Sequence, residues 1–391
     1  ETHDALAELE AAGVVMQPRQ QPPSRNTRLA VVARNAAREQ AGWNDEQAER
    51  LASDIEDGKY ASVAEIEEIL ERGGPDWGAL RLVFGTDDTE EVALKFLCRE
   101  ENDDQIEQKE LRQDLYSLLN EEFGTSFGPD GDVPTARREM SNRVLATDFL
   151  ASLSGEPPEE LSGLKAADKG PERRGCVSLA RKWRSLPELQ EGYRDCADRL
   201  DRQLSLRTLA LTREQLSQVE TFQSAEERLQ ECVEKELAES PRRELLEVAE
   251  ERRRSFWSRA VGLIQARWAL AEAAGRVLQR AAEVESATRT APKSTWGYVE
   301  GDTGGDEPWY LLDRAHRHME ARAHDFEFDL GGRHESLQEL LTVARTRYSE
   351  VCGSLAQRFL ERREEDGFGC DDLLSQHDVF AELVRPHLGE V

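Results

Sequence analysis

The sequence has few aromatic residues and no long apolar run. Only 6% of its residues are Phe, Trp or Tyr, and alternating β-branched runs are hard to find. The sequence therefore has few residues of the types that favour an extensive β-sheet. No apolar stretch reaches the ~18 residues of a membrane-spanning helix, and the N-terminus has no signal-peptide pattern. We therefore expect a helical protein in the cytoplasm, without contact to a membrane.

Zinc and disulfide patterns are also missing. No two of the six cysteines form a CxxC pair, and the scattered positions fit a reducing compartment better than a disulfide framework. These positions are Cys98, Cys176, Cys196, Cys232, Cys352 and Cys370.

The common catalytic motifs are not found either. The chain has no GxxxxGK[ST] loop, no GxGxxG after a strand, no GxSxG and no HExxH. Chemistry by scattered residues stays open, but we assign no catalytic residue and expect that this chain is not an enzyme.

What the chain has in excess is acidic charge. It carries 79 acidic and 51 basic side chains, a formal net charge of -28, so it should repel nucleic acid and anionic lipid at long range. The charged fraction of 33% and the hydrophobic fraction of 38% are typical of amphipathic helices with wide solvated faces. Apolar residues recur at helical spacing, which argues against disorder.

Proline and glycine clusters divide this helical pattern. We expect an N-terminal helical segment over 1–74 with a linker near 17–26, a helical subdomain over 75–153, a linker over 154–172 and a larger helical domain over 173–391. The predicted fold is an all-α, multi-lobed bundle of amphipathic helices with little or no β-sheet.

Several helix starts have recognisable capping residues. Asn44, Ser62 and Thr89 are predicted N-caps. Pro134 suits the first turn of a helix, because the N–H group that proline lacks would have no intrahelical partner at that position. The paired acids at 87–88, 103–104 and 371–372 lie near predicted helix starts, so we attribute them to capping rather than to a metal site.

Basic residues gather in the segment RRGCVSLARKWR. Basic side chains around a tryptophan are the right composition for a nucleic-acid contact, although no recognised motif is present. The alternative is that they form ion pairs with neighbouring acidic helices. The candidate contact residues are Arg173, Arg174, Arg181, Lys182, Trp183, Arg184, Arg242, Arg243 and Arg252.

The segment RRRSFW, residues 252–257, lies within a predicted continuous helix over 241–285. The apolar stripe of that helix, extended at 100° per residue, passes through Arg253, which should therefore point toward the core and need a carboxylate partner. Our candidate partner is Asp313. Arg254 should pair with Glu250, and Arg252 should face solvent. The predicted structural joint consists of Arg253, Phe256, Trp257, Trp309, Tyr310 and Asp313.

One helix carries a metal-like spacing. His316, Glu320 and His324 are each four residues apart and could share a face. Neighbouring arginines crowd the same turns with positive charge, so a solvated or partner-facing helix is the better interpretation. A metal-dependent hydrolase using these three residues is kept as an alternative that predicts stoichiometric zinc.

The order of several segments resembles a known family. ARKWRSLPELQEGYRDCADRLDRQL, VETFQSAEERLQ, EERRRSFW, DEPWYLLDRAHRHME and LLSQHDVFAELVRPHL follow one another as in the region preceding the phosphatase-like domain of PglZ proteins. These proteins belong to the BREX, or phage growth limitation, systems of bacterial antiviral defence. The resemblance runs from about residue 173 to the C-terminus. The segments GTDDTEEVALKFL and NRVLATDFLASLSGE are similar to the family's earlier helical region, whereas residues 1–74 resemble no part of it.

This resemblance implies a longer protein and a role for the present chain. The parent would continue into an alkaline-phosphatase-superfamily domain that binds divalent metal and hydrolyses phosphate esters or phosphodiesters. The chain itself would be a non-catalytic scaffold, without a cofactor, that docks the methyltransferase and other components of the system. The rival hypothesis is a nucleic-acid-binding module that uses the basic strip 173–184 together with Arg242, Arg243 and Arg252.

Overall fold

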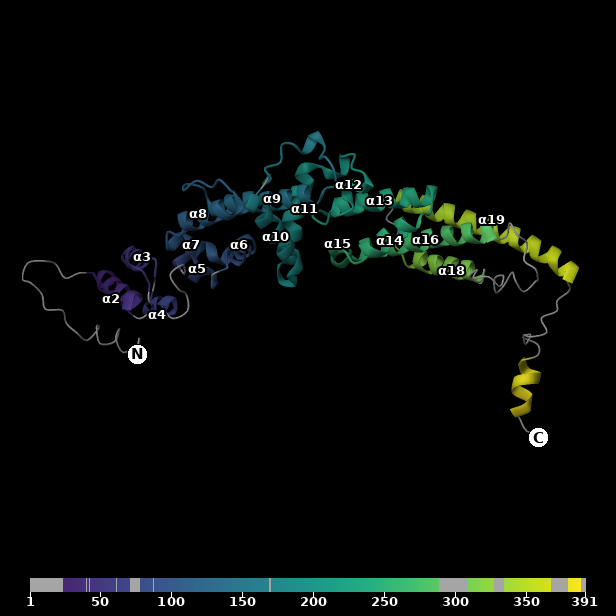
Figure 1. The fold of residues 1–391 in the computed structure, drawn as a ribbon, viewed down its shortest axis with the longest axis horizontal. Coiled ribbons are helices and arrows are strands. Elements are labelled where there is room, and N and C mark those ends of the chain that lie inside the picture. The colour runs from purple at the N-terminus through teal and green to yellow at the C-terminus, as the bar shows by residue number, and fades with distance from the viewer. Residues whose placement is uncertain are drawn as a thin grey trace, which may run out of the picture. The chain divides into compact units, whose positions relative to one another are not determined.

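The computed structural model describes most of the chain, and every regular element in the described residues is helical (Figure 1). No strand occurs among these residues, so the all-α prediction is confirmed. The described residues are 24–39, 41, 43–60, 62–70, 78–86, 88–168, 170–287, 309–326, 334–366 and 379–387. Of the predicted linker near 17–26, residues 17–23 lie outside them, and Arg25 and Asn26 belong to the first described helix. The acidic pair at 371–372 also lies outside them.

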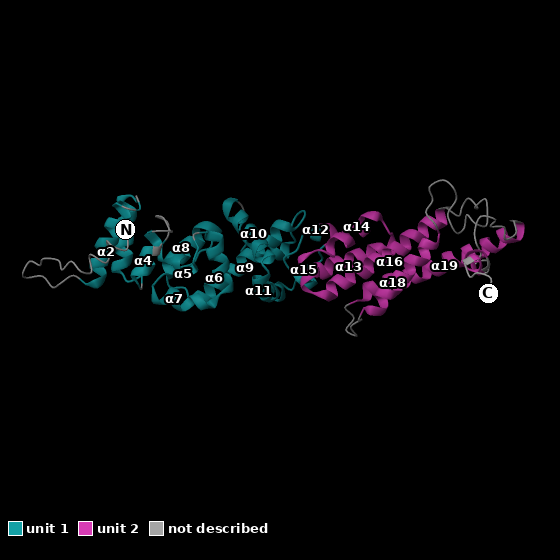
Figure 2. Ribbon diagram, turned by 90° about the horizontal axis from the view of Figure 1, so that it is seen from below, with its two compact units in different colours: residues 1–211, 215–225 teal, residues 212–214, 226–391 magenta. Residues whose placement is uncertain are grey.

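The chain forms two compact units (Figure 2). Unit 1 comprises residues 1–211 and 215–225, and unit 2 comprises residues 212–214 and 226–391. The predicted linker over 154–172 lies within unit 1, where Leu161 and Ala167 are buried. The backbone N–H of Ala167 donates to Thr147 Oγ1 at 2.9 Å, which ties this segment to the helix before it.

Unit 1 begins with a helical hairpin of α2 (Arg25–Glu39) and α3 (Asp45–Glu56). Small residues at helical spacing, Ala30, Ala33 and Ala37, form the buried side of α2 and allow the close approach of α3. Asn44 caps α3 in a reciprocal capping box with Gln47, with distances of 2.9 and 3.0 Å. The predicted cap is confirmed.

The remaining helices of unit 1 start with similar signals. Ser62 caps α4 (Val63–Glu68), and Pro134 lies in the first turn of α9 (Val133–Ser152), both as predicted. The cap of α6 (Thr89–Cys98) is Asp88 and not Thr89, because the Asp88 carboxylate accepts the backbone N–H groups of residues 90 and 91 at 2.8 and 3.3 Å. The other α-helices of unit 1 are α5 (Ala79–Phe84), α7 (Asp103–Gln108), α8 (Arg112–Phe123), α10 (Gly170–Ser185) and α11 (Gln190–Leu204). The short α12 (Arg213–Leu216) has residues in both units.

Helices α9 and α10 pack together at the centre of the unit 1 core. The aromatic pairs Phe149–Phe222 and Trp183–Tyr193 meet edge to face, with ring centroids 5.1 and 5.4 Å apart. This geometry suits the opposite charge of ring edge and ring face. The core therefore depends on large rings that the sequence supplies sparingly.

Unit 2 is built around α16 (Gly262–Ala287). This helix packs against α14 (Arg243–Arg252), α15 (Phe256–Ala260), α18 (Tyr310–Asp325) and α19 (Glu335–Asp366), and it accepts side chains of α13 (Gln223–Glu239, in unit 2 from residue 226 on). Gly275 in α16 gives room for leucines from its neighbours, because a Cβ at this position would lie 2.6 Å from Leu246 Cδ2 and 3.0 Å from Leu237 Cδ2. A short π-helical segment, η6 (Phe380–Val384), follows α19 in the chain.

The predicted continuous helix over 241–285 is wrong. The chain leaves the helix after Arg252, Ser255 caps the short α15 by accepting from Ser258 N at 3.3 Å, and α16 starts only at Gly262. Each interruption resets the helical phase, so a stripe cannot be extended through it at 100° per residue. This break changes the role of every arginine in the 252–254 triplet.

Candidate functional site

Arg252, expected in solvent, is buried in unit 2. It is 6% exposed and pairs with Glu226, whose side chain is fully buried. Arg252 Nε donates to Glu226 Oε1 at 3.2 Å, and Arg252 Nη2 donates to Oε2. Ser255 Oγ and Trp268 Nε1 donate to the same carboxylate at 3.2 and 2.7 Å. The cation and the two further hydrogen-bond donors offset the free-energy cost of removing the Glu226 carboxylate from water.

Glu226 belongs to a buried polar stripe on α13 formed by Glu226, Gln230 and Glu234, all fully buried. Gln230 Nε2 donates to the carbonyl oxygen of Ile264 at 2.9 Å. Glu234 accepts two bonds from Arg267, each of 2.7 Å. Burial alone would lower the pKa of Arg267, but its hydrogen bonds and charge interaction with Glu234 outweigh burial and raise it.

The other predicted pairs of the triplet do not form. Arg253 Nη1 donates to Glu272 Oε2 at 2.9 Å, and Asp313 accepts from Arg317 and from Tyr348 Oη. The Arg253–Asp313 pairing is therefore wrong. Glu250 lies 3.6 Å from Arg276, and no ion pair between Glu250 and Arg254 occurs among the described residues.

The predicted structural joint is only partly buried. Phe256 and Trp257 are each 2% exposed and pack edge to face with centroids 5.0 Å apart. Trp309 is also buried, whereas Tyr310 is 54% exposed. The aromatic residues after the triplet thus belong to the core, and the arginine that accompanies them there is Arg252.

The histidine helix α18 uses its candidate ligands for other contacts. His316 stacks on Tyr348 with ring centroids 3.8 Å apart. Glu320 accepts from Arg345 Nε and Nη2 at 2.7 and 2.9 Å, which lowers the pKa of its carboxyl group. The described residues contain no group of three His, Cys, Asp or Glu side chains that could hold a metal ion, and His324 joins none.

Two members of the basic strip, Trp183 and Arg184, lie in the core of unit 1. Trp183 is fully buried and donates from Nε1 to the carbonyl oxygen of Leu189 at 3.1 Å. Arg184 Nη1 donates to Asp148 Oδ2 at 2.5 Å and to Tyr193 Oη at 3.0 Å. The expected surface role of these two residues is wrong, because the basic segment forms an amphipathic helix whose tryptophan faces inward.

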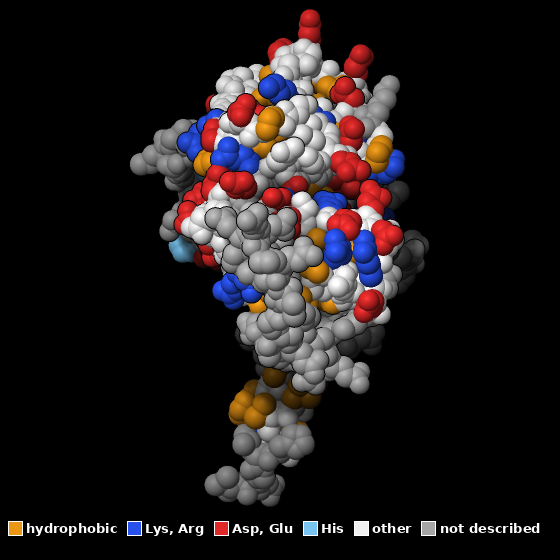
Figure 3. Space-filling model, turned by 90° about the vertical axis from the view of Figure 1, so that its left-hand side faces the viewer, with side chains coloured by type: hydrophobic (Ala, Val, Ile, Leu, Met, Phe, Trp, Pro, Cys, Tyr) orange, Lys and Arg blue, Asp and Glu red, His pale blue; other side chains and the backbone are white. Residues whose placement is uncertain are grey.

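Arg242 and Arg243, two candidate contact residues of unit 2 outside the basic strip, have acidic partners. Arg242 lies 2.9 Å from Glu236, and Arg243 lies 2.9 Å from Glu247. These are surface ion pairs, as the alternative interpretation of the strip expected. Positive and negative side chains are similarly interspersed on the face seen in Figure 3.

What is left of the strip is a basic groove on α10. Arg173, Arg174, Arg181 and Lys182 line a surface groove of about 720 Å³ whose other lining residues are Val177, Ser178 and Ser185, without a carboxylate. Lys182 is held by Asp88 at 3.3 Å. Arg174 and Arg181 are exposed and have no ion pair among the described residues. They are therefore the cations most available to an external anion.

The chemistry of the basic groove suits contact with phosphate. Guanidinium groups bind phosphate oxygens through charge-assisted hydrogen bonds. Base recognition by stacking would require an exposed aromatic ring, and Trp183, the aromatic residue of this segment, is buried. Trp183 therefore offers no stacking surface to a nucleic acid in this groove.

Comparisons of the chain with protein-family models, with curated proteins and with solved structures give no match. None of the described helices is long and apolar enough to cross a membrane. Functional inference for this chain therefore relies on its own residues.

Proposed function

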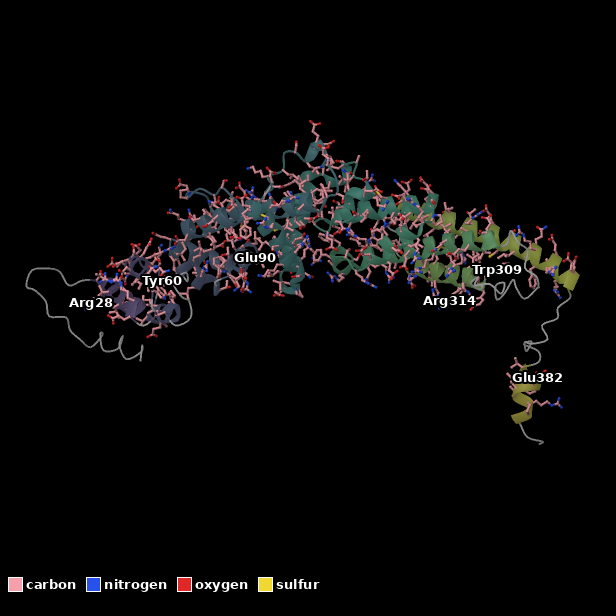
Figure 4. All side chains as sticks on the ribbon, in the orientation of Figure 1. Arg28, Tyr60, Glu90, Trp309, Arg314 and Glu382 are labelled. Carbon is pink, nitrogen blue, oxygen red and sulfur yellow. The ribbon has the colours of Figure 1, made fainter. Side chains whose placement is uncertain are left out.

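We propose that this chain is a non-catalytic helical scaffold of a cytoplasmic phage-defence protein similar to PglZ. It docks other components of the system, the methyltransferase among them, and positions a metal-dependent phosphatase-like domain carried by a longer parent protein. The observation that carries the docking role is an exposed apolar segment at 379–384, near Glu382 in Figure 4. Val379, Phe380, Leu383 and Val384 are 39, 60, 54 and 39% exposed.

Exposed side chains of this kind favour a partner surface. Four large apolar residues within six positions form a contiguous apolar face rather than scattered single residues. A helical segment with such a face is a recurrent element of protein recognition, in which the apolar side chains enter a groove of the partner. The single acidic residue between them, Glu382, offers a matched control position.

The docking role is tested by co-purification of the full-length parent with the other defence components. The double variant Phe380→Glu, Leu383→Glu should lose at least one component, because two charges would be buried in an apolar contact. Glu382→Gln should retain all of them. Undiminished co-purification of the double variant would show that this segment does not dock a partner. Retention of the component by the 391-residue chain alone would place its docking site within this chain.

A second candidate function is nucleic-acid binding through the basic groove, which the exposed Arg174 and Arg181 favour. The expected binding is weak and steeply salt-dependent. Neutralising about three phosphates gives a slope of about -3 for the logarithm of affinity against the logarithm of salt concentration. A duplex titration at two salt concentrations measures it. The double variant Arg174→Ala, Arg181→Ala should reduce both affinity and slope, with Arg243→Ala as control. Absence of binding at low salt would remove this candidate.

The metal-dependent hydrolase remains a separate alternative. It requires Glu320 to leave Arg345 and coordinate a metal together with His316 and His324. Metal analysis of the purified chain tests it, since this alternative predicts stoichiometric zinc.

A further inference from the structure

Unit 1 contains a cavity of about 420 Å³ between α3, the N-terminal end of α5 and α8. This volume lies in the range of small-molecule sites. Two aromatic side chains, Trp43 and Tyr60, line it and are 8 and 9% exposed. Three carboxylates also line it: Glu121 and the two on which the site centres, Asp54 and Asp114. Tyr60 is labelled in Figure 4.

A lysine fixes the two carboxylates. Lys59 Nζ lies 3.1 Å from Asp54 Oδ1 and 3.1 Å from Asp114 Oδ2. Lys59 itself is not among the lining residues. The ammonium group therefore holds one oxygen of each carboxylate from outside the cavity and ties α3 to α8. A single positive charge shared by two carboxylates leaves this group with a net charge of about -1.

The second oxygen of each carboxylate is available. Asp54 Oδ2 and Asp114 Oδ1 accept no hydrogen bond from the part of the chain that the structure describes. Both residues line the cavity, so these oxygens are acceptors for a group inside it. A donor that carries positive charge satisfies them best, because charge-assisted hydrogen bonds to carboxylates are the stronger kind.

The rest of the lining supports a cation attached to an apolar or aromatic body. Trp43 and Tyr60 can stack on a planar group or bind a cation over the ring face. Two arginines, Arg50 and Arg81, also line the cavity. Arg50 is exposed and forms no ion pair among the described residues. The positive charge of these arginines disfavours a ligand with several cationic groups and favours a single one.

We propose that this cavity binds a small organic monocation, with a guanidinium, amidinium or primary ammonium group placed against Asp54 and Asp114 and an apolar body beside Trp43 and Tyr60. This site is independent of the docking segment at 379–384 and of the basic groove on α10. If the cavity did not bind such a cation, both of those proposals would be unaffected.

The test uses three probes of one shape and different charge, titrated into the full 391-residue chain by calorimetry or ligand-observed NMR. Benzamidine, a planar monocation, should bind. Benzamide, its neutral analogue, should bind at least about tenfold more weakly, and benzoate should not bind. Preference for benzoate would overturn the proposal, because it would mean that the arginines and not the carboxylates determine the ligand.

Two variants and a control connect the binding to the proposed residues. Asp114→Asn should weaken benzamidine about tenfold or more, because it removes an ionised acceptor. Arg50→Ala should strengthen it, because it removes a competing positive charge without disturbing a buried group. The control is Asp130→Asn, which makes the same charge change at an exposed site and should leave binding unchanged.

The control also separates the site from general attraction of cations to an acidic protein. Equal weakening by Asp130→Asn and Asp114→Asn would show such attraction and refute the site. Weaker binding to Arg50→Ala would contradict the assigned charge of the ligand. Because this second variant changes an exposed residue, the proposal stays testable even when Asp114→Asn fails to fold.

Discussion

Replacing Arg252 by methionine would leave the buried carboxylate of Glu226 without its cation. Breaking a buried ion pair in this way costs about 3–5 kcal/mol. Two hydrogen bonds to the carboxylate, from Ser255 and Trp268, would remain. Methionine has a similar length of apolar chain, so little cavity is created. The loss therefore comes from uncompensated charge.

Protonation sets an upper limit to this loss. A glutamate with an ordinary pKa of about 4.3 takes up a proton at pH 7 at a cost of about 3.7 kcal/mol. When the buried charge becomes more costly than that, the carboxyl group is protonated instead. We therefore expect Arg252→Met to lower the free energy of unfolding by about 3–4 kcal/mol at pH 7. The difference from the wild type should shrink by about 1.4 kcal/mol for each pH unit toward pH 5.

Urea unfolding at pH 7 and pH 5, followed by circular dichroism and tryptophan fluorescence, measures both values. Arg253→Met is the matched control. The Arg253 side chain is 36% exposed, and its partner Glu272 keeps a second arginine, Arg276, at 2.8 Å. The loss should therefore be clearly smaller than for Arg252→Met. The double variant Glu226→Leu, Arg252→Met should recover most of the stability, because it removes both charges. Equal losses for the two single arginine variants, or a loss that does not fall toward pH 5, would refute the reasoning.

Three further predictions concern unit 1 and the histidine helix. Burial raises the pKa of Cys98 to about 12, so this thiol should not react with a disulfide reagent at pH 8 in the native protein; rapid native labelling of Cys98 would contradict the fold. Asp88→Ala should destabilise unit 1 by about 1 kcal/mol and Asp88→Ser should restore it, because serine also caps a helix; chemical unfolding measures both, and Thr89→Ala should be near neutral. Arg345 lowers the pKa of Glu320. Their ion pair therefore stabilises unit 2 at pH values above the ordinary glutamate pKa, and this stabilisation is lost as the pH falls through the lowered pKa. In Arg345→Ala the pKa of Glu320, measured by NMR titration, should return toward its ordinary value, and this pH dependence of stability should disappear with it.

Some errors of the sequence-based prediction were avoidable. In α10, Cys176, Leu179, Ala180 and Trp183 follow the spacing of an amphipathic helix and are all buried. This pattern alone predicts that Trp183 faces the core and is not available to a nucleic acid. By contrast, the burial of Arg184 depends on Asp148, which lies 36 residues away on another helix. No local sequence pattern predicts that partner.

The helical fold could be predicted from the amino-acid sequence, because helical periodicity and capping are local properties. Asn44, Ser62 and Pro134 mark helix starts through contacts within one turn, and the structure confirms each of them. Which charged side chains are buried could not be predicted in this way, because it depends on contacts between helices. The break after Arg252 resets the helical phase, and the partner of this arginine, Glu226, comes from α13. A charged side chain is buried only where folding brings a compensating group close to it. Helical spacing alone therefore indicated Arg253, whereas the contact with Glu226 buries Arg252.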